Sequence, residues 1–492
     1  MYRIISGSTH GLRDTKEFVE LLGEQVVTLP ESWRELFGGQ SQVIVTRAPG
    51  RIDLMGGIAD YSGSLVLPFP IADATHVAFQ RATNKRIRIA SLPGISKSEP
   101  RLFEIALGEL LAEGSPLGYA EAHARLTRNS ESSWAAYVVG AFLVLMREGH
   151  LDLREGANVL IRSSVPEGKG VSSSAALEVA VMHAIIAAFE LEISAQETAL
   201  LCQKLENQIA GAPCGVMDQM TASCGEANHL LGLLCQPAEL KDLVELPAEL
   251  EVWGIDSGVS HSIGGANYGT VRTAAFMGYR IIADCAGLKV RAAVASGRVE
   301  IEDQRWNGYL ANISPEEFEQ KFAAEIPDRI LGKDFLDRYQ GINDTFTEVD
   351  PWIDYPVRRA TEHPIYEHHR VQAFAQALKN WRGVTQAEML GDWMSQSHQS
   401  YSACGLGSAA TDKLASLAAE ASDKGLIGAR ISGGGSGGTV AILGRRGAGA
   451  AVGEVADRYQ HETGRQTTII SGSSCGAETF GALKLQRTDN FA

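Results

Sequence analysis

A glycine- and serine-rich segment, V-P-E-G-K-G-V-S-S-S-A-A at residues 165–176, has the composition of an anion-binding loop. Gly168 and Gly170 can adopt backbone angles that are closed to other residues, so main-chain N–H groups there can approach a ligand closely. The serines at 172–174 stand where an apolar helical segment begins, and the unpaired N–H groups and positive dipole end of a helix favour phosphate. A glycine-rich turn with a serine N-cap is the alternative interpretation of this segment.

Three charged side chains outside this loop are candidates for chemistry. Arg51 lies between two β-rich runs, where it could face a cleft or form a structural ion pair. Asp218 follows the Gly- and Pro-bearing turn at 211–215, an irregular backbone where functional residues tend to lie, although an Asp there could also cap the next helix. Glu206 borders the buried face of a helix, so its carboxylate needs a partner, either a metal ion or an Arg or Lys.

Three further patterns have a chemical interpretation. Trp134 and Tyr137 stand one turn apart in an apolar helical segment and are either core aromatics or a nucleobase platform. The H-x-x-x-E-H pattern at 363–368 fits neither common zinc register, so we predict no zinc site there. The G-x-G-x-x-G pattern at 433–438 is followed by a strand signal, whereas a dinucleotide fold requires a helix there. We therefore predict a glycine hairpin that packs against the loop at 165–176.

The composition of the 492-residue chain is that of an ordinary soluble globular protein, with 45% hydrophobic and 21% charged residues. A net charge of -15 argues against a surface that binds nucleic acid or an anionic membrane. The seven cysteines form no C-x-x-C pair, which favours free thiols in a reducing compartment. The N-terminus has no signal-peptide pattern and no run approaches 18 apolar residues, so we expect a cytoplasmic protein.

The candidate residues must be positioned by the strands and helices around them. Strands are predicted on both sides of the polar segment at 51–61, and buried helices are predicted at 133–146 and 175–189. The Ser-x-x-Glu pattern at 194–197 is a capping-box signature for the helix that carries Glu206. We expect these elements to bring the charged residues and the loop to one cleft.

An acidic, proline-bearing change in composition at 236–251 predicts a domain boundary near residue 240. The first domain would span 1–240, with 1–40 an N-terminal extension that carries no readable chemistry, and the second would span 241–492. Within the second domain, residues 271–345 have a mostly helical pattern and residues 350–364 the composition of a loop.

Four motifs, in this order along the chain, resemble the signature set of the GHMP kinase superfamily of galactose, homoserine, mevalonate and phosphomevalonate kinases. They are A-P-G-R-I-D-L-M-G, V-P-E-G-K-G-V-S-S-S-A-A-L-E-V-A, G-A-P-C-G-V-M-D-Q and G-A-R-I-S-G-G-G-S-G-G. H-S-I-G-G-A-N-Y-G-T-V-R at 261–272 is similar to the second-domain sugar loop of the galactokinase branch. From about residue 40, G-G-I-A-D-Y-S-G-S-L-V-L and S-Y-S-A-C-G-L-G-S resemble the kinase domain of L-arabinokinases. The resemblance implies a two-domain α+β fold with the active site in the interdomain cleft.

The resemblance also implies a role for each matching residue. Asp218 would accept or orient the proton of the sugar hydroxyl, with Arg51 against it to keep its pKa low. Ser174 and Glu206 would bind Mg²⁺ through hard oxygen donors. The residues expected to bind ATP are Pro166, Gly168, Gly170, Val171, Ser172, Ser173, Ser174 and Ala175, with Trp134 near the adenine. Those expected at the sugar are Gly57, Ile58, Asp60, Gly215 and Tyr268.

The sugar is predicted from a departure at residues 56–61. Galactokinases have Gly-Glu-His-x-Asp-Tyr, whereas this chain has G-G-I-A-D-Y, so the acid that would receive the C6 hydroxyl of galactose is replaced by Gly57. L-Arabinopyranose has the galactose ring without the hydroxymethyl group, and the resemblance therefore implies an ATP- and Mg²⁺-dependent kinase that makes L-arabinose 1-phosphate. D-Galacturonate and D-galactose are the alternative substrates. A non-catalytic regulator that binds sugar and ATP is the alternative of another class, although the intact S-S-S-A-A segment, Asp218 and Arg51 favour catalysis. The sequence does not reveal the oligomeric state.

Overall fold

The computed structural model describes residues 2–23, 29–34, 36–38, 42–93, 99–259, 266–293 and 297–488. In this part of the chain, nine strands form the first sheet, in the order β1-β21-β2-β3-β8-β4-β5, with β10 and β11 attached along β3. Their bounds are β1 (Tyr2–Ser6), β21 (Leu483–Arg487), β2 (Val43–Met55), β3 (Leu65–Ala82), β8 (Gly156–Ser163), β4 (Arg86–Ser91), β5 (Arg101–Ala106), β10 (Leu233–Leu234) and β11 (Glu239–Leu240). Strand β2 is buried along its whole length, so its polar side chains must find partners inside the protein.

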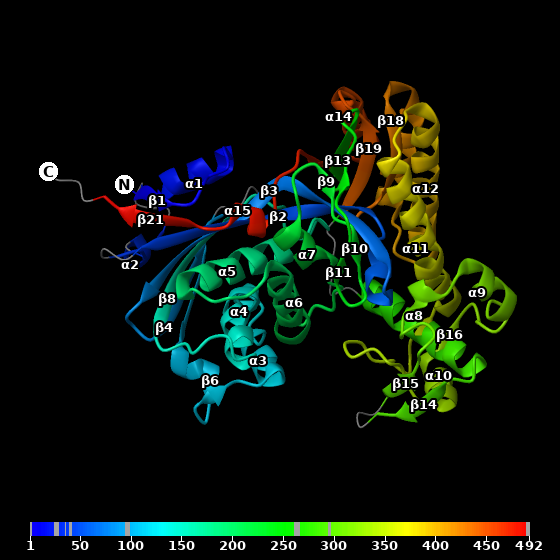
Figure 1. The fold of residues 1–492 in the computed structure, drawn as a ribbon, viewed down its shortest axis with the longest axis horizontal. Helices are drawn as coiled ribbons and strands as arrows, with labels where there is room; N and C mark the ends of the chain where they lie inside the picture. Colours follow the sequence, from blue (N-terminus) through cyan, green and yellow to red (C-terminus); the bar gives the residue numbers. More distant parts are fainter. Residues whose placement is uncertain are drawn as a thin grey trace.

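Helices cover one face of this sheet, and Figure 1 shows them beneath β2 and β3. Helices α4 and α5 are apolar nearly all round and therefore form the centre of the first core. The predicted buried helices are confirmed, and so is the cap of α6, where Ser194 Oγ accepts the N–H of Glu197. The helices of this region are α1 (Arg13–Gly23), α2 (Glu31–Arg34), α3 (Tyr119–Leu126), α4 (Ala136–Arg147), α5 (Ser173–Phe189), α6 (Ala195–Leu205), α7 (Met217–Cys224) and α15 (Ala477–Phe480).

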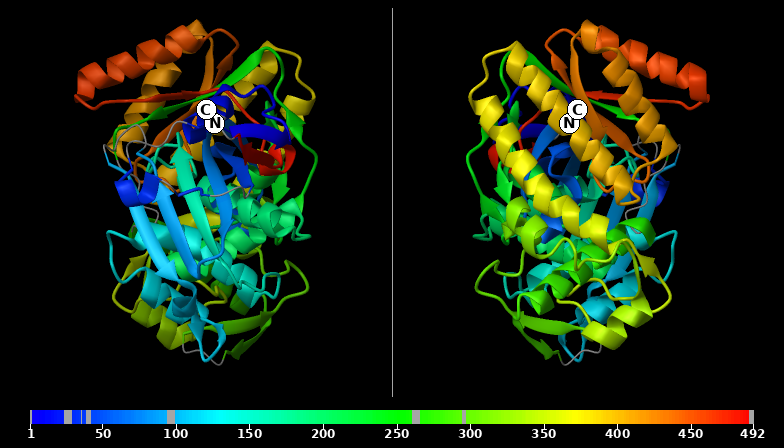
Figure 2. Two further views of the ribbon diagram at one scale, coloured as in Figure 1. Left: turned by 90° about the vertical axis from the view of Figure 1, so that its left-hand side faces the viewer. Right: turned by 90° about the vertical axis from the view of Figure 1, so that its right-hand side faces the viewer.

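A second, antiparallel sheet joins four of the described strands in the order β18-β19-β13-β20. They are β18 (Leu426–Ile431), β19 (Thr439–Arg445), β13 (Leu250–Asp256) and β20 (Ile469–Ser471). The connection between β18 and β19 holds the glycines of 433–438, so the predicted hairpin is confirmed. The helices around it are α8 (Ala266–Cys285), α11 (Val357–Lys379), α12 (Val384–Ala403), α13 (Ala409–Glu420) and α14 (Gly449–Thr463). The long helices α11 and α12 cross one side of the molecule (Figure 2).

Two sequence predictions in this region are wrong. Helix α11 begins at Val357, inside the stretch predicted as a loop, and holds Pro364 in its interior. The proline removes one helical hydrogen bond, but its side of the helix is buried. The stretch 271–345 is not mostly helical, because a hairpin of β14 (Lys289–Ala292) and β15 (Val299–Glu302) follows α8, and only α9 (Pro315–Lys321) and α10 (Gly332–Tyr339) are further α-helices in its described part. The K-V-R-A and V-E-I-E segments alternate with the period of a strand.

The last strand of the chain lies in the first sheet. β21 pairs with β2 on one side and with β1 on the other, so the two ends of the chain lie side by side (Figure 1). The described part of residues 1–40 thus contributes an edge strand and, through α1, packs on the sheet. The division near residue 240 stays a prediction, and β21 crosses it. In the described residues, none of the helices combines the length and the apolar character that a membrane span needs.

Candidate active site

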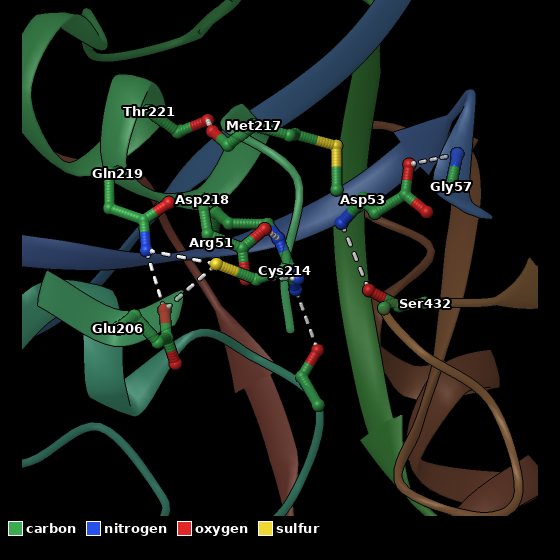
Figure 3. Close-up of polar contacts among 12 residues, drawn as sticks. Arg51, Asp53, Gly57, Glu206, Cys214, Met217, Asp218, Gln219, Thr221 and Ser432 are labelled. Carbon is green, nitrogen blue, oxygen red and sulfur yellow. Dashed lines mark hydrogen bonds and ion pairs between the residues drawn. The ribbon is translucent and has the colours of Figure 1, made fainter. Parts of the chain in front are cut away.

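Arg51 and Asp218 form a bidentate ion pair at the centre of the site (Figure 3). Arg51 Nε donates to Asp218 Oδ1 at 2.9 Å and Arg51 Nη2 to Oδ2 at 2.8 Å. Strand β2 supplies the arginine, which is buried, and the first turn of α7 supplies the aspartate. The N-cap of α7 is Val216, so Asp218 is not a helix cap, and its carboxylate is directed to Arg51 instead. The cap interpretation of Asp218 is therefore wrong, whereas the ion pair fits both interpretations of Arg51. The catalytic role of the two residues stays a prediction.

The loop at 165–176 lies directly against this pair. Arg51 Nη1 donates to Gly170 O at 2.7 Å, so one guanidinium contacts both the aspartate and the loop. Gly168 and Gly170 have φ values of 70° and 72°, the left-handed region that favours glycine. Ser172 also has a positive φ, 62°, which is strained for a residue with a Cβ.

Helix α5 begins at Ser173 with an open N-terminus. Ser172 occupies the N-cap position, but its hydroxyl makes no capping hydrogen bond and, among the described residues, is buried without a partner. The interpretation as a simple serine-capped turn is therefore wrong, because the serine side chain leaves the first N–H groups of the helix unpaired. Unpaired N–H groups at a helix N-terminus form an anion-binding site.

Two cavities meet at this loop. The larger, about 570 Å³, is lined by Trp134 and Tyr137, and by Pro166, Gly168, Ser173 and Ser174 of the loop. Trp134 lies against Arg101, whose guanidinium carbon is 4.9 Å from its ring centre, and its place in the wall favours a nucleobase platform over a core aromatic. Val171 and Ala175 are buried and are absent from this wall, so their contribution is to the backbone of the loop.

The smaller cavity, about 60 Å³, holds the ion pair and all five residues predicted at the sugar. It shares Gly168 and Ser173 with the larger one, so the loop forms the boundary between them. Its lining includes Arg51, Gly57, Ile58, Asp60, Gly170, Ser172, Glu206, Cys214, Gly215, Asp218 and Tyr268.

Asp60 is the acidic residue on the far side of the smaller cavity. Burial, reinforced by the charge of Asp218, raises the pKa of Asp60 to about 7. A Cβ at Gly215 would lie only 1.6 Å from Asp60 Oδ2, so the carboxylate packs directly on the backbone of the turn at 211–215. Only glycine permits this contact, which explains the residue type at 215.

Glu206 lies in a buried group of polar side chains with Cys214 and Gln219 beside it (Figure 3). Gln219 Nε2 donates to Glu206 Oε2 at 2.5 Å and to Glu178 Oε2 at 3.2 Å, so two buried carboxylates share one amide. Burial raises the pKa of Glu206 to about 7, a hydrogen bond from Ser174 opposes the shift, and the charge of Asp218 adds to it. Burial also raises the pKa of Glu178, whose Oε1 has no hydrogen-bond partner among the described residues.

The described residues contain no group of three or more His, Cys, Asp or Glu side chains arranged to hold a metal ion. A serine hydroxyl and one carboxylate, Ser174 and Glu206, nevertheless form a pair of hard oxygen donors of the kind that Mg²⁺ prefers when phosphate and water complete its shell. On α11, Glu367 accepts the N–H of Gly56 and the hydroxyl of Ser397, so this carboxylate is a structural acceptor.

The sequence reasoning missed three residues near the site. Arg272 on α8 forms a buried bidentate pair with Asp344 (2.8 and 2.9 Å) and donates to Cys214 O at 3.3 Å, so it supports the turn before Asp218. Lys169 pairs with Asp256 of β13 at 2.8 Å. Tyr401 of α12 accepts the N–H of Ile58. All three residues lie inside motifs given in the sequence analysis, and this was the available signal. Residues 261–265 of the predicted sugar loop lie outside the described residues.

Comparison with known proteins matches three segments of the chain. The GHMP kinases N terminal domain matches residues 136–226, the galactokinase galactose-binding signature residues 31–81, and the GHMP kinases C terminal model residues 374–461. An L-arabinokinase of Arabidopsis thaliana is 40% identical over 99% of this chain, and a galactokinase of Streptomyces coelicolor is 30% identical over 69% of it and 84% of its own length. The chain spans 52% of the L-arabinokinase and 60% of a Chloroflexus aggregans galactokinase that is 32% identical over 52% of this chain.

Solved structures share the fold. The galactokinase of Lactococcus lactis complexed with galactose has a TM-score of 0.68 at 22% identity, covering 92% of this chain and 98% of that one. The mevalonate kinase of L. major in complex with R-mevalonate has a TM-score of 0.51 at 15% identity, covering 89% and 97%. The two-domain α+β fold expected from the sequence is confirmed.

Proposed function

Because the chain belongs to the galactokinase branch of the GHMP kinase superfamily, we propose that it transfers the γ-phosphoryl group of ATP to the anomeric hydroxyl of L-arabinose. The observation that carries this proposal is the Arg51–Asp218 pair, which lies in the smaller cavity at the boundary with the larger one. A nucleotide in the larger cavity and a sugar in the smaller one would present donor and acceptor on opposite sides of the loop at 165–176.

The larger cavity suits ATP. Trp134 offers an aromatic face for the base, and the loop amides with the N-terminus of α5 offer donors for the phosphates. Ser174 and Glu206 would hold Mg²⁺ beside them, since both are hard oxygen donors and Glu206 shares its amide partner Gln219 with a second buried carboxyl group, that of Glu178. The bound ion would neutralise charge that develops on the phosphates.

Asp218 would accept the proton of the anomeric hydroxyl as its oxygen bonds to the γ-phosphorus and the bond to the β-phosphate oxygen breaks, releasing ADP. Arg51 holds both carboxylate oxygens, which fixes the orientation of the aspartate. Most of the rate enhancement should then come from positioning and charge stabilisation, as expected for a loose phosphoryl-transfer transition state. Asp60 and Tyr268 supply polar groups for the ring hydroxyls.

The proposed sugar follows from Gly57. Its place in the wall of the smaller cavity means that no side chain from position 57 reaches the sugar, and its apolar neighbour Ile58 completes that wall. A pentopyranose needs no acceptor there, whereas galactose would bury its C6 hydroxyl without a partner. That loss costs about 1–3 kcal/mol.

The first prediction is the order of sugar preference. With Mg-ATP, a coupled ADP-release assay should give kcat/KM for L-arabinose about 10-fold to 100-fold above that for D-galactose, because one unpaired buried hydroxyl discriminates by that amount. D-Galacturonate should also be poor, since Ile58 offers no cation for its carboxylate. A kcat/KM for D-galactose or D-galacturonate equal to or above that for L-arabinose would contradict the assignment of L-arabinose as the substrate. If calorimetry shows sugar binding but no sugar in the panel causes ADP release from ATP, the protein is instead a non-catalytic regulator.

A second prediction tests the nucleotide cavity. Trp134→Ala should raise the KM for ATP about 10-fold or more with little change in kcat, because base–aromatic stacking is worth about 1–3 kcal/mol. Trp352, which is 81% exposed, is the matched control, and Trp352→Ala should leave both constants unchanged. An unchanged KM for ATP in the Trp134 variant would place the base elsewhere.

A further inference from the structure

Position 57 is closed to every side chain larger than hydrogen. A Cβ built on Gly57 would lie 1.5 Å from Tyr401 Oη, 2.4 Å from Tyr401 Cζ and 2.7 Å from Asp53 Oδ2. Separations below 3 Å are far shorter than van der Waals contact allows, so Tyr401 occupies the volume that a side chain at 57 would need. The neighbouring Gly56 has a φ of 106°, so the backbone there is in the left-handed region as well.

Tyr401 is held firmly in this place. It is fully buried, its hydroxyl accepts the N–H of Ile58 at 2.8 Å, and the same hydroxyl donates to Gly433 O at 2.9 Å. Its ring lies edge-on to His363 with centres 5.2 Å apart. The hydroxyl of Tyr401 thus connects the segment of Gly57 and Ile58, which lines the smaller cavity, to the glycine hairpin at 433–438. That hairpin packs on the loop at 165–176.

A buried ion pair lies beside Tyr401 and contacts the same segment. Arg430 and Asp53 are both fully buried, with Arg430 Nη1 3.0 Å from Asp53 Oδ2 and the guanidinium carbon 5.0 Å from the Tyr401 ring centre. Asp53 Oδ1 in turn accepts the N–H of Gly57 at 3.2 Å (Figure 3). Displacing the tyrosine would therefore disturb a buried charged pair, so the ring cannot make room for a side chain at 57 without a large cost.

We infer that Tyr401 is a specificity-determining residue that keeps an acidic side chain out of the sugar cavity by filling the volume of residue 57. This inference rests on the proposed function, because it explains why the site would serve a pentopyranose and lack an acceptor for a hydroxymethyl group. Tyr401 acts through the backbone of Gly57 and Ile58, so it is a positioning residue. The sugar preference would then depend on two residues from different helices, Gly57 of the 3-10 helix Gly57–Ser62 and Tyr401 of α12.

The steric part is tested without any sugar. Thermal unfolding of G57A should show a clearly lower Tm than wild type, because the added methyl group meets Tyr401. The same change in a Y401L background should lower Tm clearly less, because only the close contact with Asp53 Oδ2 then opposes the methyl group, and this coupling is the expected result. Tyr355, another fully buried tyrosine of the same core that accepts one N–H bond, gives the matched background. G57A should remain destabilising in Y355L. Harmless G57A in wild type, or equal damage in all three backgrounds, would overturn the inference.

The specificity part uses G57E/Y401L, with folding checked by circular dichroism. Its ratio of kcat/KM for D-galactose to that for L-arabinose should rise about 10-fold or more above the ratio of Y401L alone, because the new carboxylate can accept the C6 hydroxyl. An unchanged ratio in a folded G57E/Y401L variant would contradict the specificity role of Tyr401. Failure of G57E/Y401L to fold, when G57A/Y401L does fold, would contradict it as well. If the wild-type enzyme itself does not prefer L-arabinose, the proposed function is wrong. The Tm coupling between positions 57 and 401 would still test whether Tyr401 occupies the volume of a side chain at 57.

Discussion

Replacing Asp218 by asparagine is expected to lower kcat by about 100-fold to 10,000-fold and to change the affinity for the sugar little. The amide has the shape of the carboxylate but cannot accept the proton of the anomeric hydroxyl. It also turns an N–H₂ group toward Arg51, whose second contact, the bond to Gly170 O, should keep the guanidinium in place. Steady-state kinetics give kcat, and calorimetry gives the affinity.

The matched control for this variant lies on the same strand. Arg47, four residues before Arg51 on β2, is buried and pairs with the half-buried Asp14 of α1, with Nε 2.9 Å from Oδ2. Asp14→Asn weakens an Arg–Asp pair on the same strand that lines neither cavity, so it should lower Tm and leave kcat unchanged. A variant Asp218→Asn that binds no sugar but keeps kcat would show that the aspartate only positions the substrate.

Replacing Glu206 by glutamine is expected to cut kcat by about 100-fold or more and to raise the Mg²⁺ concentration needed for half-maximal rate. A metal ion that neutralises phosphate charge contributes several kcal/mol in the transition state, and about 1.4 kcal/mol corresponds to a factor of ten. The free protein should keep its Tm or gain stability, because the change removes one of two buried carboxylates that share Gln219. Loss of rate without loss of stability separates a ligand from a structural residue.

Glu178→Gln is the control for the metal prediction. Glu178 is a buried carboxylate on the same amide, but it lines neither cavity. It should therefore change the Mg²⁺ dependence far less than Glu206→Gln does. Full activity of Glu206→Gln at limiting Mg²⁺ would remove Glu206 from the site.

Features encoded over short spans of sequence could be predicted. The cap at Ser194, the buried helices α4 and α5 and the glycine hairpin before β19 each depend on residues within about one element, and all three are confirmed. The pairing of Arg51 with Asp218 spans 167 positions and no local pattern could show it. It followed only from the order of the four motifs.

The rest depends on contacts between distant segments. Tyr401 contacts Ile58 across 343 positions, and Arg272 contacts Asp344 across 72 positions. No local sequence pattern around the tyrosine or the arginine indicates these partners. Residues 350–364 were predicted as a loop, because a composition that includes proline reports on the backbone alone and not on the core that packs on α11. Tertiary packing, which periodicity does not encode, decides each of these cases.

The position of β21 has a consequence for synthesis on the ribosome. Among the described strands, β1 pairs only with β21, whose residues 483–487 are made long after those of β1 and β2. The edge of β2 that β21 covers is also open until then. An open strand edge can pair with another chain, so the nascent protein carries an association-prone edge until β21 has been made. The edge is covered only when residues 483–487 have left the exit tunnel.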